Sequence, residues 1–343
     1  GTLAKRGWWN SVYVSTPDLQ NSLTHAIVEH GGRDNGCVTV VGEDGNEGLL
    51  ELSNCRLRRS GTYGLTLGGG AALRGDSGGN TYTGNRSAAV SAQTRNIHTL
   101  SADSTYTDND GDYVLVESKN VNGEGPDETQ RTWAALDVPY RIQGDFFNVN
   151  NLELVIEPGA VFELSQGTKL FLQNGTRLTW SGVLEDGTVE PIVFTGTDEQ
   201  RGWWDGIVIN TSDNNNLIEQ VIVEYGGGDN TGNITANPGP GEASYFEMTH
   251  CTLRQSGEYG MYINSTVELD LDSNEYTENT AGPARIETDN MQMLSGDSTF
   301  QGNDNDYVLV SQRNVNGQGA EQTQFTWDAL DVPYRMQSDE HQI

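Results

Sequence analysis

The chain contains two long copies of one sequence, and this duplication restricts the possible folds more than any other feature. The opening segment GTLAKRGWWNSVYV is related to GTDEQRGWWDGIVI from Gly196, and CRLRRSGTYG from Cys55 is related to CTLRQSGEYG from Cys251. A third pair of segments begins at Tyr113 and Tyr307 and is identical at 22 of 33 positions. A repeat architecture is therefore the first fold to consider.

A shorter period lies inside each copy. Apolar residues that share one local template recur every 23 to 25 residues, as Leu57, Tyr82 and Tyr106 in the first copy and as Leu253, Tyr276 and Phe300 in the second. Turn residues follow them at the same step, as Ser60, Asn85 and Asn109, and as Ser256, Asn279 and Asn303. Two columns with one period predict a structural unit about every 24 residues.

Each of these units has the properties of one coil of a β-solenoid. Polar and apolar residues alternate, and the 42 glycines are spread along the chain, which is typical of short strands joined by turns. Strands that pair in parallel need right-handed crossovers. We predict an all-β fold, a single-stranded right-handed parallel β-helix of about 24 residues per coil, with asparagine ladders at one turn.

The duplication predicts two consecutive parts of one solenoid. Residues 1–145 are the first β-helix repeat, which lacks the leading coils of the second copy, and residues 146–343 are the second repeat, which continues the same solenoid. The first and last coils of a solenoid need a cover. We therefore expect the ends to contact other copies of the chain or adjacent repeats.

The charge of the chain argues against two classes of partner. Asp and Glu number 49 against 19 Lys and Arg, which gives a formal net charge of -30. That charge repels phosphate backbones and anionic lipids, and no apolar run reaches membrane-spanning length. We expect no nucleic acid partner and no membrane insertion. The same acidity suits an extracellular or cell-surface location.

The three cysteines are too few for a disulfide framework, and their spacing matches no zinc motif. Cys55 and Cys251 stand at equivalent positions of the two copies, which favours small buried core residues. Cys37 has no counterpart in the second copy. A disulfide between Cys37 and Cys55 stays open on the sequence alone.

The strings LVIEPGAVFEL, PIVFTGT, GWWDGIVI and VIVEYGG follow one another in the second copy. In this order they resemble the right-handed parallel β-helix repeats of bacterial secreted and surface proteins, within the pectin-lyase-like superfamily. The resemblance implies this fold for nearly the whole chain. It implies no single activity, because the fold carries lyases, hydrolases and non-catalytic surface proteins. Neither the calcium and arginine set of the lyases nor the aspartate pair of the polygalacturonases is present in full.

Two tryptophan pairs are the first candidate ligand-binding residues, namely Trp8 with Trp9 and Trp203 with Trp204. Neighbouring residues of a strand point to opposite faces, so we expect one ring of each pair to face outward. An outward ring can stack on a sugar. The alternative is that the ring packs under a neighbouring loop.

Acidic residues gather at an equivalent turn of each copy. The string DNDGDYV carries Asp108, Asp110 and Asp112, and the string NDNDYV carries Asp304 and Asp306. Such a density of oxygen ligands suits calcium, although the spacing is not that of an EF-hand. The two interpretations are a calcium site and a solvated turn at the end of an asparagine ladder.

Two segments imitate catalytic motifs. GDSGG around Ser77 resembles a serine-protease nucleophile segment but lacks a matching histidine context. His30 begins a His-Gly pair, and Tyr225 replaces it in the second copy. We interpret both segments as structural and assign no catalytic residue.

These features predict a non-catalytic extracellular structural or adhesive β-helix rod from a tandem-repeat bacterial surface or secreted protein, with assembly end to end. The duplication favours this hypothesis, because a spacer gains length with every copy. The alternative is a β-helix that binds or degrades polysaccharides as a lyase or glycoside hydrolase. Surface glycans are the expected external ligand.

Overall fold

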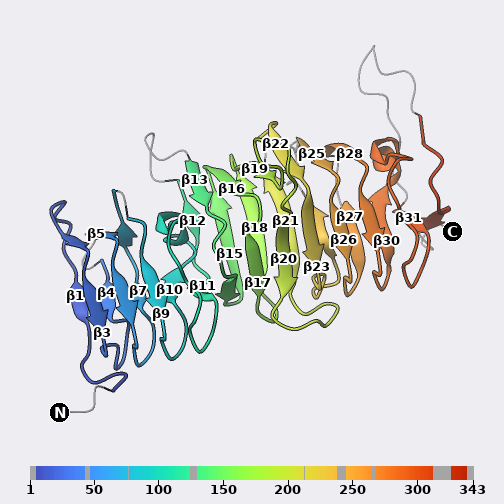
Figure 1. Ribbon diagram of the computed structural model, residues 1–343. Helices are drawn as coiled ribbons and strands as arrows, with labels where there is room; N and C mark the ends of the chain where they lie inside the picture. The colour runs from blue at the N-terminus through green and yellow to red at the C-terminus, as the bar shows by residue number, and fades with distance from the viewer. Residues whose placement is uncertain are drawn as a thin grey trace. The chain divides into compact units, whose positions relative to one another are not determined.

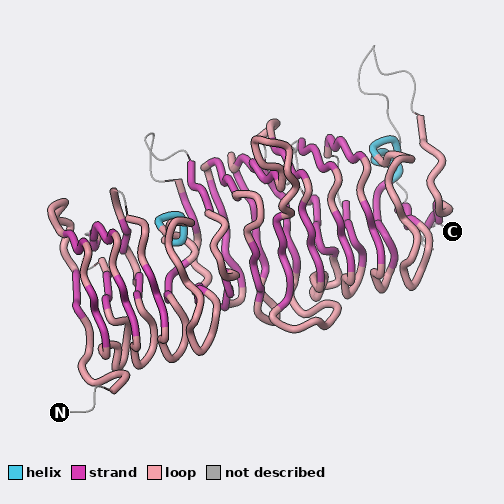
Figure 2. The backbone as a smooth tube through the Cα atoms, viewed as in Figure 1, coloured by secondary structure: helices cyan, strands magenta, loops and turns pink. Residues whose placement is uncertain are grey.

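The computed structural model describes residues 5–42, 47–75, 77–123, 130–211, 213–237, 245–263, 267–311 and 326–337. It is a parallel β-solenoid of about 11 turns, spaced about 26 residues apart. Within each part of the chain, strands of successive turns lie side by side (Figures 1 and 2). The predicted all-β parallel solenoid is confirmed. The mean spacing exceeds 24 residues because some turns carry long loops, such as residues 197–205.

The chain divides into two compact units, and unit 1 comprises residues 1–120, 132–144 and 160–163. Its largest sheet has the parallel order β1 (Val12–Val14), β4 (Val38–Val40), β7 (Leu65–Leu67), β10 (Val90–Gln93), β11 (Val114–Glu117) and β14 (Tyr140–Gln143). A second sheet contains β2 (Ser22–Thr24), β5 (Gly48–Ser53) and β8 (Ala71–Leu73), and a third contains β3 (Ile27–Glu29), β6 (Arg56–Arg58) and β9 (Thr81–Thr83). The 3-10 helix η1 (Ile97–Thr99) follows β10.

Unit 2 comprises residues 121–131, 145–159 and 164–343. One sheet has the order β12 (Val121–Asn122), β15 (Phe146–Asn150), β18 (Lys169–Asn174), β21 (Gly206–Thr211), β24 (Gly232–Ala236), β27 (Tyr259–Ile263), β30 (Gly282–Glu287), β31 (Val308–Ser311) and β32 (Tyr334–Gln337). A second contains β16 (Glu153–Ile156), β19 (Arg177–Ser181), β22 (Asn216–Glu219), β25 (Tyr245–Thr249) and β28 (Glu268–Asp272). A third contains β20 (Ile192–Gly196), β23 (Val221–Glu224), β26 (Thr252–Arg254) and β29 (Glu275–Thr277).

Three further elements complete the described chain. Strands β13 (Gln130–Trp133) and β17 (Val161–Leu164) each contain residues of both units. The 3-10 helix η2 (Thr288–Met293) follows β30. Among the described residues, neither helix has the length and apolar character needed to cross a membrane.

The predicted apolar columns form the interior of each unit. Leu57 of β6 lies in register with Tyr82 of β9, and the rings of Tyr82 and Tyr106 stack with centroids 5.1 Å apart. In unit 2, Leu253 lies in register with Tyr276, whose ring stacks on that of Phe300 at 5.0 Å. All of these side chains are buried. Stacked rings on successive coils exclude water from the interior and contribute dispersion contacts.

The predicted asparagine ladder is present in both units. In unit 1, the Asn85 Oδ1 atom accepts the backbone N–H of Ser60 at 3.0 Å, and the Asn109 Oδ1 atom accepts that of Asn85 at 3.0 Å. The same two bonds join Ser256, Asn279 and Asn303, each at 3.0 Å. In unit 1 the residue just before each ladder residue has a positive φ, as Arg59, Gly84 and Asp108. The ladder therefore satisfies buried backbone groups at a turn that has no regular strand pairing.

Candidate binding surface

The first tryptophan pair lies in a turn and not in a strand. Gly7, just before it, has a φ of +72°, a left-handed conformation that starts this turn. The Trp9 ring is partly buried, and its Nε1–H donates to the Glu29 carbonyl oxygen at 3.0 Å. The Trp8 side chain is 59% exposed. Trp8 is thus the outward ring of this pair.

The second pair also lies in a turn, after Gly202 with a φ of +73°. Trp204 is fully buried, and its Nε1–H donates to the Glu224 carbonyl oxygen at 2.8 Å. Trp203 is partly exposed, and its Nε1–H donates to the Thr197 Oγ1 atom at 2.9 Å. The Trp203 ring is therefore less available for a ligand than that of Trp8.

The acidic turns are held by arginines from the loops that carry the tryptophans. Arg6 donates to Asp110 at 2.8 Å in unit 1, and Arg201 donates to Asp304 at 2.8 Å in unit 2. Both pairs join residues more than 100 positions apart in the chain. The same cross-coil contact therefore stands at the same place in both copies.

The remaining acidic residues extend the ladder. The Oδ1 atoms of Asp112 and Asp306 accept the backbone N–H groups of Asn109 and Asn303, each at 2.8 Å. Asp108 has a φ of 63°, and its backbone carbonyl accepts the N–H of Gly84 at 2.7 Å. Over the described ranges, no group of three or more His, Cys, Asp and Glu side chains is placed to hold a metal ion. These contacts are those of a ladder end, and a calcium site stays a prediction from the sequence.

The three cysteines are buried free thiols, so Cys37 and Cys55 are not joined. The Sγ atoms of Cys55 and Cys251 make equivalent contacts, because each lies 3.3 Å from the carbonyl oxygen two residues before it. Burial raises the pKa of Cys37, and it raises the pKa of Cys251 to about 12. Both thiols therefore stay protonated and unreactive at neutral pH.

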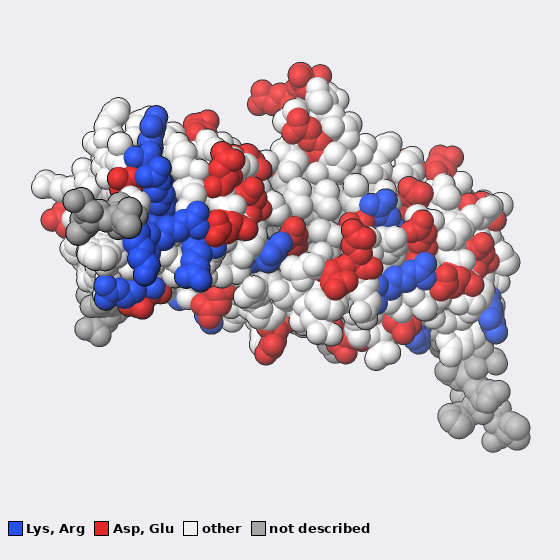
Figure 3. All heavy atoms as spheres, turned by 60° about the horizontal axis from the view of Figure 1, so that its bottom comes forward, with Lys and Arg blue, Asp and Glu red and all other residues white. Residues whose placement is uncertain are grey.

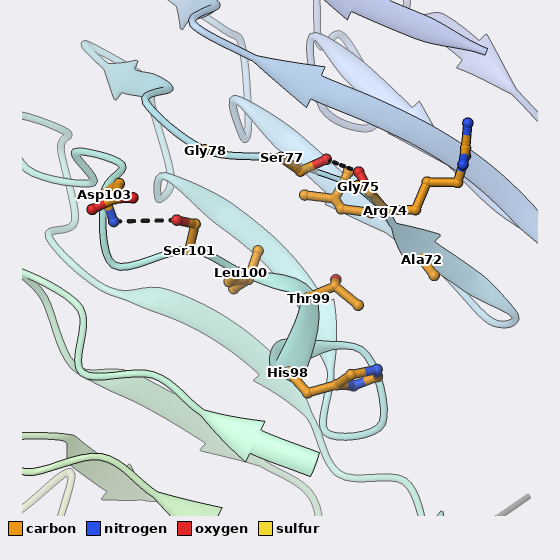
Figure 4. Close-up of a pocket in the computed structure, with 11 residues that line it drawn as sticks. Ala72, Arg74, Gly75, Ser77, Gly78, His98, Thr99, Leu100, Ser101 and Asp103 are labelled. Carbon is orange, nitrogen blue, oxygen red and sulfur yellow. Dashed lines mark hydrogen bonds between the residues drawn. The ribbon is translucent and has the colours of Figure 1, made fainter. Parts of the chain in front are cut away.

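A pocket of unit 1 brings the GDSGG segment near a histidine and an aspartate (Figure 4). Its lining includes Ser77, His98 and Asp103. The Ser77 hydroxyl donates to the Arg74 carbonyl oxygen at 2.6 Å and accepts the N–H of Leu52 at 3.0 Å. Figure 4 shows the His98 ring directed away from that hydroxyl. Ser77 is therefore a turn-stabilising residue, and the three side chains do not form a nucleophile triad.

The sequence interpretation missed a gathering of arginines on the first coils of unit 1. Figure 3 shows Lys and Arg side chains as one continuous band over this part of the molecule. We define the arginine patch as four exposed residues from three successive coils, namely Arg33, Arg56, Arg59 and Arg86. With the described residues, none of the four forms an ion pair.

Contacts between coils place Arg33 beside the Trp8 backbone and Arg86 beside the turn of Arg59. Arg33 donates from its Nη2 atom to the Trp8 carbonyl oxygen at 3.0 Å. The Arg86 N–H donates to the carbonyl oxygen of Ser60, the residue after Arg59, at 3.2 Å. Arg56 lies on β6, in register with the exposed Ile27. The patch therefore combines guanidinium groups that form no ion pair with a described residue and the exposed side chain of Trp8.

The two copies differ at the patch arginines but share an arginine that forms an ion pair. Arg58 pairs with Glu29 at 2.7 Å, and the equivalent Arg254 pairs with Glu224 at 2.6 Å. The four patch arginines have no such counterpart, because their equivalents are Gly228, Thr252, Gln255 and Thr280. Alignment of the two copies would have revealed these surplus arginines in the sequence. The fold adds that they are exposed and lie on adjacent coils.

Comparisons with protein-family models, curated proteins and solved structures found no match to this chain.

Proposed function

We propose that the protein is a non-catalytic extracellular solenoid with a structural or adhesive role, from a tandem-repeat bacterial surface or secreted protein. The observation that carries this proposal is that the two copies share their internal contacts. The shared contacts are the pairs Arg6 with Asp110 and Arg201 with Asp304, the pairs Glu29 with Arg58 and Glu224 with Arg254, and the two asparagine ladders. Repeating such a set of structural contacts lengthens a solenoid, whereas catalysis needs only one copy of an active-site cleft.

The resemblance to pectin-lyase-like β-helices of bacterial surface proteins is part of this proposal. That fold occurs in enzymes and in non-catalytic proteins, so the residues of the site, and not the fold, determine whether such a protein is catalytic. Here the Ser77 hydroxyl bonds the backbone groups of Arg74 and Leu52, and the acidic turns bind arginine and backbone groups. These contacts favour the structural role over the alternative of a polysaccharide lyase or hydrolase.

Incubation with acidic polysaccharides tests the absence of catalysis. We expect the chain to release neither reducing ends nor unsaturated sugars from polygalacturonate or alginate, with and without added calcium. Release that rises with protein concentration and stops after heat denaturation would support the lyase or hydrolase alternative.

Assembly through the ends of the solenoid is a further part of the proposal, because edge strands offer unpaired backbone groups to another chain. Sedimentation velocity at increasing protein concentration is the measurement. We expect the mean sedimentation coefficient to rise with concentration. A single species of monomer mass over the whole range would contradict assembly of this chain.

A further inference from the structure

We propose that the arginine patch of unit 1, together with Trp8, is a binding site for an acidic polysaccharide. The inference deepens the adhesive role, on which it rests, by naming the surface and the chemical class of the ligand. Uronate carboxylates would bind the guanidinium groups of Arg33, Arg56, Arg59 and Arg86. One sugar ring would stack on the indole of Trp8.

The patch arginines have no structural task that the second copy retains. By contrast, Arg58 binds Glu29 and the equivalent Arg254 binds Glu224, so this arginine is kept in both copies. At the patch positions the second copy has Thr252 and Gln255 in the same strand and turn. The fold therefore forms without arginine there, and the patch is surplus to folding.

Electrostatics also favours an anionic ligand. The chain has a formal net charge of -30, yet the four patch arginines lie on successive coils and form no ion pair with a described residue. Guanidinium groups repel one another at close range and gain most from a bound anion. An arginine can bind a carboxylate through two parallel hydrogen bonds. An anionic ligand therefore fits this surface.

The spacing of the patch also suits a polymer of charged sugars. Arg33, Arg59 and Arg86 come from turns of three successive coils, and neighbouring strands are roughly 4.8 Å apart. A polysaccharide chain presents one carboxylate per uronate and advances by a similar length per sugar. Trp8 adds an exposed aromatic side chain, and its backbone carbonyl oxygen accepts the hydrogen bond from Arg33. A repeating anion with rings thus matches the patch better than a single small anion does.

Polygalacturonate binding to the full chain tests the proposal, with neutral dextran as the comparison ligand. The variant Arg59→Gln with Arg86→Thr introduces the residues of the second copy, so the turn is expected to fold. We expect its affinity for polygalacturonate to fall by about tenfold or more, because charge-assisted hydrogen bonds are lost. Trp8→Ala should also weaken binding, with little change in its salt dependence.

The matched control removes the same charge elsewhere in unit 1. Arg74→Gln with Arg95→Gln should change the affinity by less than about twofold, since charges outside the patch act weakly through salt water. An equal loss in both double variants would overturn the proposal, as would binding of dextran as tight as that of polygalacturonate. If wild type is a dimer that Arg59→Gln with Arg86→Thr dissociates, the patch is a contact between copies, and the polysaccharide site is refuted.

The outcomes for the two proposals differ. If polygalacturonate is neither bound nor cleaved, the proposed polysaccharide site is refuted and the structural role is not. Cleavage of polygalacturonate refutes the non-catalytic role even where the arginine variants show that the patch holds the ligand.

Discussion

Single asparagine side chains join successive coils at the turns. Asn85 is fully buried and makes contacts in both directions along its unit. Its Oδ1 atom accepts the N–H of Ser60, and its Nδ2 atom donates to the Leu57 carbonyl oxygen at 3.2 Å and to the Asn109 Oδ1 atom at 2.9 Å. Replacement of this side chain would leave several buried polar groups without partners.

We expect Asn85→Ala to lower the free energy of unfolding by about 3 kcal/mol, since each orphaned buried group costs about 1–3 kcal/mol. Urea unfolding followed by circular dichroism measures this change. Asn279→Ala in unit 2 should have a similar effect, because its contacts are equivalent. Asn10→Ala, which changes an exposed side chain, is the control. Equal urea midpoints for Asn85→Ala and Asn10→Ala would contradict the role of the ladder.

The ion pair between Glu29 and Arg58 predicts a pH dependence with a definite sign. The hydrogen bond from the Arg58 guanidinium lowers the pKa of Glu29 below its ordinary value of 4.5. The pair therefore stabilises the fold fully above pH 4.5, and this contribution is lost as the pH falls through the lowered folded-state pKa.

We expect Glu29→Gln to destabilise the protein at neutral pH by no more than about 1 kcal/mol, because the pair is partly exposed. The difference from wild type should shrink toward zero in acid. Urea midpoints of both proteins across the acidic range provide the measurement. A difference that stays constant down to the most acidic folded sample would show that the ion pair is not its cause.

The very short strands are stabilised by columns of buried side chains that stack from coil to coil. β6 and β9 have three residues each, and only the middle residue of each faces the interior. Tyr106 continues the column, and its hydroxyl donates to the Ser101 carbonyl oxygen at 3.0 Å. The second copy has Phe300 at this position, without a hydroxyl. Ring packing therefore matters more than the hydroxyl.

The two copies thus predict the ranking of substitutions at Tyr106. Tyr106→Phe should cost at most about 1 kcal/mol of unfolding free energy, and Tyr106→Ala about 3–5 kcal/mol because it leaves a cavity against Tyr82. Thermal and urea unfolding of both variants give the comparison. Similar losses for Phe and Ala would mean that the hydroxyl, and not the stacked ring, holds the column.

The period of the sequence predicted the columns and ladders because each coil repeats the same residue types at the same step. It failed for the tryptophan pairs, which resemble strand residues in the sequence. Gly7 and Gly202 turn the chain just before them through positive φ. The pairs of Arg6 with Asp110 and Arg201 with Asp304 were also missed, because only the folded loops bring such distant residues together.

At the scale of the whole molecule, the duplication provides an internal control. Contacts that both copies retain belong to the framework, and residues present in one copy mark what that copy does beyond folding. The patch arginines could be found in this way from the sequence. Their exposure and their position beside Trp8 could not, because these depend on the loop that crosses the first turns of unit 1.

Residues about one coil apart are parallel register partners in both copies, and disulfide formation between paired cysteines tests this register. Arg56 pairs with Thr81 in unit 1, and Thr252 pairs with Glu275 in unit 2. Register partners roughly 4.8 Å apart lie within the Cα range of a disulfide, whereas a shift of two residues places them about 8 Å apart. We expect Arg56→Cys with Thr81→Cys, and Thr252→Cys with Glu275→Cys, to form disulfides on mild oxidation, while Arg56→Cys with Thr83→Cys stays reduced. Equal oxidation of matched and shifted pairs, or none in either copy, would contradict the solenoid.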